Sequence, residues 1–107
     1  MEVAALRPLP CPTCGQRHDL GVWLDQPGRR WLHGRVVEAV CAGCGAASQL
    51  ELANGTMAIG SVAPGPEGSF RPDLRLPQPG LDVEASPAGL LVTLGQRTWA
   101  TPMHARR

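Results

Sequence analysis

The residues of this chain best suited to chemistry are its four cysteines, which fall into two matched pairs. Each pair is a C-x-x-C followed at once by glycine, and 26 residues separate the two pairs. A glycine after the second cysteine can adopt the positive φ that such a turn often needs, and the backbone N–H groups of the turn point at the sulfurs. Zinc prefers four soft ligands in a tetrahedron. The spacing therefore predicts one structural Zn²⁺ per chain, bound by Cys11, Cys14, Cys41 and Cys44.

Three other uses of the cysteines stay open at this point. Iron also accepts four thiolate ligands, two disulfides suit a secreted domain, and a C-x-x-C beside a βαβ pattern suits redox chemistry. No helical periodicity follows either pair, which disfavours the redox interpretation, and no export signal is seen, which disfavours disulfides. The doubled C-x-x-C arrangement favours zinc.

The two C-x-x-C-G turns stand at Cys11–Gly15, where the second residue is proline, and at Cys41–Gly45. In these turns the chain resembles the zinc ribbon group, with its rubredoxin-like knuckles, over about residues 8–52. The resemblance implies two knuckles on hairpin turns and a small antiparallel sheet. It implies no single activity, because zinc ribbons serve in transcription factors, ribosomal proteins, enzyme subunits and viral assemblies. Rubredoxin packs its metal against aromatic rings, whereas this chain has no Tyr and one Phe, so electron transfer is not inferred.

Composition bounds the function classes. At 107 residues the chain is one domain, or a small domain with an appendage, and its core is small enough to benefit from a metal cross-link. The ten basic residues are all Arg and face nine acids, so a net charge of +1 gives no electrostatic footprint for nucleic acid. No stretch approaches the ~18 apolar residues of a membrane helix, and no export signal is seen at the N-terminus. We expect a soluble cytoplasmic protein without membrane contact.

Alternating apolar residues in the first part of the chain predict β-strands. A Pro-Gly pair and an Asn-Gly pair predict turns, because Asn-Gly suits the positive φ angles of a type I′ hairpin turn. The elements expected here are a strand over 18–25, a turn over 26–29, a returning strand over 30–40, and a hairpin with strands over 48–53 and 56–62.

The second part begins with a Pro/Gly-rich stretch over 63–80, which cannot form a continuous central strand because proline donates no ladder hydrogen bond. The elements expected after it are a strand over 81–85, a turn over 86–89, a strand over 90–100 and a loose tail. The sequence thus predicts an all-β fold: a small antiparallel zinc ribbon, extended by further hairpins and a Pro-rich crossover. Its three parts are a ribbon and hairpin over 1–62, a connector over 63–80 and a C-terminal hairpin with tail over 81–107, together forming one unit.

Two groups of side chains near the knuckles are further candidates for site residues. His18 and His33 could bind metal, but four cysteines already fill a tetrahedron, so neither is expected to be a ligand. Aromatic and basic side chains could instead contact nucleic acid by stacking and phosphate binding, although aromatic pairs more often pack across strands. The candidates for nucleic-acid contact are Trp23, Arg29, Arg30, Trp31 and Arg35.

These features favour a structural zinc protein that binds another protein, as an interaction module or a small subunit of a larger assembly. An enzyme is not expected, because four thiolates close the coordination sphere that a catalytic zinc keeps open. The alternative is a nucleic-acid-binding zinc ribbon that acts as an accessory in transcription or translation.

Overall fold

The computed structural model describes residues 8–62 and 70–102, apart from the side chains of His33 and Val62. Within these ranges the chain forms short strands and one six-residue helix. In chain order they are β1 (Pro8–Pro10), β2 (Arg17–Asp19), α1 (Leu20–Asp25), β3 (Arg30–His33), β4 (Val36–Val40), β5 (Ala47–Ala53), β6 (Thr56–Val62), β7 (Phe70–Pro77), β8 (Leu81–Ser86), β9 (Gly89–Leu94) and β10 (Arg97–Pro102). No helix in this part of the chain is long and apolar enough to cross a membrane.

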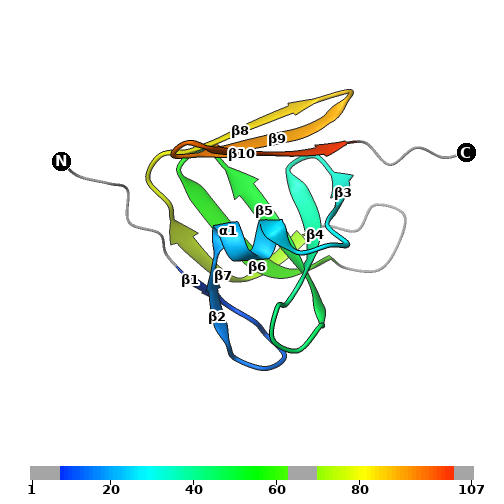
Figure 1. Cartoon of the computed structure of the whole chain (residues 1–107), viewed down its shortest axis with the longest axis vertical. Coiled ribbons are helices and arrows are strands. Elements are labelled where there is room, and N and C mark those ends of the chain that lie inside the picture. Colours follow the sequence, from blue (N-terminus) through cyan, green and yellow to red (C-terminus); the bar gives the residue numbers. More distant parts are fainter. Residues whose placement is uncertain (1–7, 63–69, 103–107) are drawn as a thin grey trace, which may run out of the picture.

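The strands form three antiparallel sheets, which confirms the predicted β fold class. They are the pair β1-β2, a five-stranded sheet in the order β3-β4-β5-β6-β7, and a three-stranded sheet in the order β10-β9-β8. Figure 1 shows the three-stranded sheet as a layer at the top of the molecule, while the loops joining β1 to β2 and β4 to β5 lie at the bottom.

The strand predicted over residues 18–25 is wrong beyond Asp19, where the chain turns into helix α1. Asp19 begins the helix by accepting a hydrogen bond from the backbone N–H three residues on, at 3.2 Å. Leu20, Trp23 and Leu24 are buried, at the spacing of one helix face rather than of a strand. The described pairing of β2 with β1 runs from Arg17↔Pro10 to Asp19↔Pro8, so it ends at the residue that caps the helix.

Two predicted strands each prove to be a pair of strands. Residues 30–40 form β3 and β4, and the chain reverses between them at Gly34, whose φ is 53°. Residues 90–100 form most of β9 and β10, and the chain reverses between them at Gly95, whose φ is 64°. Each reversal uses a glycine in the left-handed region, which other residues rarely adopt. The strand predicted over 81–85 and the turn after it are confirmed by β8 and by its tight connection to β9.

The hairpin predicted around Asn54-Gly55 is confirmed, but its turn is not type I′. Of the two central turn residues, only Gly55 has a positive φ, at 81°, whereas a type I′ turn needs a positive φ at both. Asn54 has a different role: its side-chain oxygen accepts a hydrogen bond of 2.7 Å from the N–H of Val83. The N–H of Gly55 donates to the carbonyl of Leu81 at 2.9 Å. The turn therefore ties the five-stranded sheet to the edge of β8.

The segment expected to be a connector over 63–80 contains the edge strand β7. Pro72 pairs with Gly60 of β6 where the register shifts, which agrees with the restriction of proline to edges and bulges. Residues 63–69 and the tail over 103–107 lie outside the described residues.

One hydrophobic core joins the sheets. Its buried residues come from β1, α1, both larger sheets and the cysteine loops, and the largest include Leu9, Trp23, Leu50, Met57, Leu90 and Trp99. Burial of apolar side chains at roughly 25 cal/mol per Å² is the main force holding these layers together.

Polar contacts also join helix α1 and the turn after it to β10. Asp25 accepts hydrogen bonds from the indole of Trp99 at 2.9 Å and from Arg97 at 2.6 Å, and both contacts lower the pKa of its carboxyl. Arg29 donates to the hydroxyl of Thr101 at 2.7 Å and to the carbonyl of Leu24. The C-terminal sheet is thereby fixed over the helix.

Gly60 lies in β6 at the register shift, where the backbone of β7 leaves no room for a side chain. A Cβ at this position would lie 2.0 Å from the carbonyl oxygen of Arg71 and 2.9 Å from the Cα of Pro72. We expect Gly60→Ala to lower the free energy of unfolding by about 1–3 kcal/mol, since backbone rather than a flexible side chain must move. Denaturant unfolding measures this. Ser61→Ala, at the exposed next position, should change stability by less than about 0.5 kcal/mol; equal stability of both variants would contradict the contact.

Candidate metal centre

The four cysteines lie on two loops of the same construction. Residues 11–16 join β1 to β2 and residues 41–46 join β4 to β5, so each loop is the tip of a hairpin. In each loop the N–H of the closing glycine donates to the carbonyl of the first cysteine, at 2.8 Å for Gly15 and 2.9 Å for Gly45. These glycines have φ angles of 81° and 80°. The expected positive φ after each C-x-x-C is confirmed, as is the placement of both knuckles on hairpin turns.

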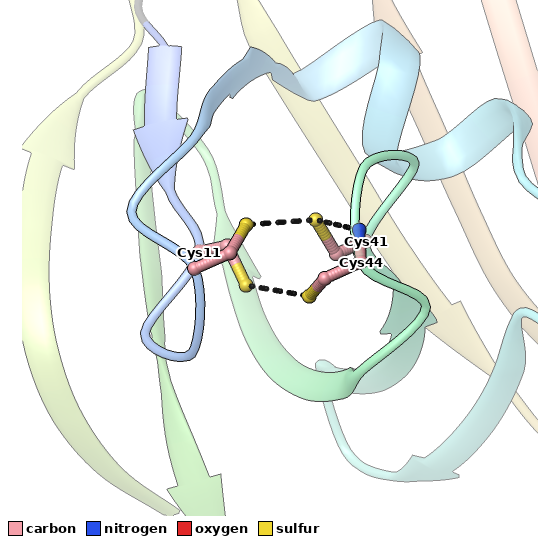
Figure 2. A group of neighbouring side chains, drawn as sticks. Cys11, Cys41 and Cys44 are labelled. Atoms are coloured by element: carbon pink, nitrogen blue, oxygen red, sulfur yellow. Dashed lines mark hydrogen bonds between the residues drawn. The ribbon is translucent and has the colours of Figure 1, made fainter.

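The two loops face each other and bring the four sulfurs to one point, as Figure 2 shows for the labelled cysteines. All four Sγ atoms lie within 4.8 Å of one another. Across the loops, Cys11 Sγ is 3.7 Å from Cys44 Sγ, and Cys14 Sγ is 3.8 Å from Cys41 Sγ. A tetrahedral ion with sulfur ligands at ~2.3 Å separates its ligands by ~3.8 Å, whereas a disulfide joins them at ~2.05 Å. The geometry fits a metal ion, and the thiols are free.

Each loop also directs backbone N–H groups at its first sulfur. Thr13 donates to Cys11 Sγ at 3.3 Å, and Gly43 donates to Cys41 Sγ at the same distance. Cys11 and Cys41 are buried, whereas Cys14 and Cys44 are exposed. The buried cysteine of each loop therefore accepts a backbone hydrogen bond at its sulfur, and the exposed cysteine lies on the solvent side of the site.

The pKa values of the thiols show why the cluster favours a cation. Burial raises the pKa of Cys11, but the N–H groups of Cys14 and Thr13, together with the thiols of Cys44 and Cys41, outweigh it and bring the pKa to about 6. The N–H of Ala46 lowers the pKa of Cys44, but burial and the neighbouring thiols raise it to about 12. The pKa of Cys14 is also raised, by burial and by the thiols of Cys41 and Cys11. Once one thiolate forms, the next ionises against its charge; a metal ion removes that repulsion.

His18 on β2 links the cluster to the core. Its Nε2 lies 3.4 Å from Cys41 Sγ, and its ring meets the ring of Trp23 edge-on, with centroids 5.6 Å apart and planes at 81°. The indole N–H of the buried Trp23 donates in turn to the carbonyl of Leu9 at 3.2 Å. From the sequence, His18 is considered only as a metal ligand and is not expected to be one. Its contact with the sulfur of Cys41 depends on tertiary packing, for which the sequence has no signal. The side chain of His33 lies outside the described residues.

The structure does not gather the residues named for nucleic-acid contact into one exposed surface. Trp23 is fully buried, and Trp31 packs against the core while its indole donates to the carbonyl of Gly34 at 2.8 Å. Arg29 is partly buried in the contacts with β10 described above. Arg30 pairs with Glu38 at 2.8 Å, which leaves Arg35 as the exposed arginine of the set without an ion pair among the described residues.

Comparison of the chain with protein-family models, curated sequences and solved structures finds no match. The class of site therefore rests on its geometry alone: a pair of knuckle-like hairpin tips whose four cysteines can hold one metal ion.

The contact between His18 and Cys41 leads to a prediction about metal affinity. We expect His18→Ala to weaken binding of the metal ion by about tenfold, because groups that hydrogen-bond to metal ligands hold them in place. His18→Gln keeps a side-chain N–H and should recover part of the loss. Competition against a chromophoric chelator measures the affinity.

Thr13→Ala is the matched control, since Thr13 is an exposed residue of the first cysteine loop whose backbone N–H, not its side chain, bonds Cys11 Sγ. Equal affinities for His18→Ala and Thr13→Ala would show that His18 does not support the site.

Proposed function

We propose that this protein is a structural zinc protein of the zinc ribbon type that binds another protein, as an interaction module or a small subunit of a larger assembly. The observation that carries the proposal is the four-sulfur cluster, whose cross-loop distances of 3.7 and 3.8 Å match one tetrahedral ion. Four thiolates are the ligand set of closed structural zinc sites. Iron accepts the same ligands, but zinc is the ion that we propose.

The position of the cluster supports a structural role. The metal ion would join the tip of the β1-β2 pair to the tip of the β4-β5 hairpin, two elements that belong to separate sheets. Structural zinc contributes on the order of 10–16 kcal/mol of apparent binding free energy, which becomes folding free energy when the metal-free chain lacks the site. For a chain of 107 residues this is comparable to its whole expected stability.

The same ligand set argues against catalysis. A catalytic zinc keeps one coordination position for water or substrate, and here the sulfurs occupy all four. Four thiolates together with one Zn²⁺ would carry a net formal charge of about −2, which would weaken the metal as a Lewis acid. The useful part of the protein is then the surface that the metal ion helps to position.

Protein binding is favoured over nucleic-acid binding by the charged groups near the knuckles. Arg29 and Arg30 are engaged within the chain, and Trp23 has no exposed ring face. Nucleic-acid binding would need several free cations, and it would weaken steeply with salt. Nucleic-acid binding is therefore the less favoured of the two functions.

The metal itself is tested by analysis and by substitution. We expect about one zinc per chain in the purified protein, and loss of both metal and fold when any of Cys11, Cys14, Cys41 or Cys44 is replaced by serine or when a strong chelator is added. Elemental analysis and near-ultraviolet circular dichroism measure these changes. Thr13→Ala, which keeps the backbone N–H that bonds Cys11, should retain both.

A fold unchanged by chelator would contradict the structural role of the metal. Visible absorption by the purified protein, together with iron instead of zinc in the elemental analysis, would show that the metal is iron.

The interaction function is tested on the full chain from its native source. We expect size-exclusion chromatography with light scattering to show a larger assembly of fixed stoichiometry, and mild affinity capture to retain a protein partner. A variant lacking one cysteine should lose the partner along with its fold. A lone monomer that retains nothing would contradict the proposal, and retention of nucleic acid with a steep salt dependence would favour the alternative.

A further inference from the structure

One face of the three-stranded sheet is turned away from the core. Along β9, Leu90, Val92 and Leu94 are buried, whereas Leu91 between them is 40% exposed and is the one large apolar side chain exposed among the described residues. The outer face of this sheet is defined here by Asp82, Glu84, Leu91, Thr93, Ala100 and Pro102. Figure 1 shows the sheet at the end of the molecule opposite the cysteine loops, so this face can be altered without touching the metal site.

Leu91 lies at the centre of the outer face between two shallow hollows. The strand register places it between Glu84 of β8 and Ala100 of β10. On the β8 side, Leu91 borders a polar hollow of about 400 Å³ with Asp82 and Glu84. On the β10 side, it borders a second hollow of about 360 Å³, which is mainly apolar and lined also by Ala100 and Pro102. One side of Leu91 therefore offers carboxylates and the other offers apolar surface.

The charge of the outer face is entirely negative. Asp82 and Glu84 are exposed, and they point to the same side because alternate residues of a strand share a face, about 7 Å apart. None of the residues that define the outer face is basic. The salt bridges among the described residues join other acids: Glu38, Glu51 and Asp25. Two carboxylates that form no salt bridge with any described cation, beside an exposed leucine, attract a partner that is both cationic and apolar.

We propose that the outer face binds an extended segment of a partner protein that carries an arginine or lysine beside an apolar side chain. This inference rests on the proposed interaction function and specifies its surface. The cation of the partner contacts Asp82 and Glu84, and the neighbouring apolar side chain packs on Leu91 and fills the hollow bordered by Ala100. The negative charge repels phosphate, so a nucleic acid or an anionic membrane is the wrong occupant.

The probe is a short synthetic peptide of alternating valine and arginine, titrated into the zinc-loaded full chain labelled with ¹⁵N. We expect amide shift changes confined to β8, β9 and β10, and binding that weakens as salt rises, because exposed charges are screened. A peptide of alternating valine and glutamate should not bind. Shift changes centred on another surface, or equal binding of the two peptides, would overturn the proposal.

Two substitutions of the outer face separate its charge from its apolar contact. We expect the double variant Asp82→Asn/Glu84→Gln to bind the arginine peptide about tenfold more weakly and with little salt dependence, and Leu91→Ser to bind about tenfold more weakly with the salt dependence kept. Asp73→Asn, an exposed acid on β7, is the control and should bind like the natural chain. Zinc content and spectral dispersion confirm that each variant is folded. Unchanged affinity in the first two variants would overturn the proposal.

The same variants separate this inference from the function on which it rests. If a partner captured from the native source is retained equally by the natural chain and by the outer-face variants, the interaction function stands and the outer face is not its site. If the natural chain is a lone monomer that captures nothing, the interaction function itself fails.

Discussion

The mutual repulsion of four thiolates is the constraint on which the rest of the structure depends. The chain brings four sulfurs to within 4.8 Å of one another, from two loops that are far apart in sequence. Without a cation, each ionisation after the first is opposed by the charge already present, and burial together with the neighbouring thiols raises the pKa of Cys44 to about 12. A bound dication would turn that repulsion into an attraction that holds the two loops together, and with them the strands that end at these loops.

The cysteine cluster and the hydrophobic core are in direct contact. Cys11 and Cys41 belong to the buried cluster, and His18 and Trp23 continue from Cys41 towards Leu9. A movement of the second loop would therefore reach the helix and the first strand. Asp25 extends the connection to β10 through Arg97 and Trp99, so the sheet farthest from the cysteines is still positioned by the same helix.

The sequence predicted the clustering of the four cysteines and the β class because both depend on local patterns. C-x-x-C-G fixes a turn by itself, and Asn54-Gly55 fixes a hairpin. The prediction failed where two local patterns competed: Leu20 and Leu24 suit either a strand or a helix, and the cap formed by Asp19 decides for the helix. It also missed the reversals at Gly34 and Gly95, where a single glycine is a weak signal. The contact of His18 with Cys41 and the engagement of Arg29 by β10 are tertiary, so no spacing in the sequence encodes them.

The turn at Asn54 and Gly55 has a consequence for how copies of this chain behave together. A small sheet with an open edge offers its backbone groups to any passing strand, and such pairing leads to aggregation. At β8 the carboxamide of Asn54 and the N–H of Gly55 already occupy the backbone groups of Val83 and Leu81. The start of this edge is thus blocked by the chain's own turn, so a strand of a second copy cannot pair there without displacing the turn.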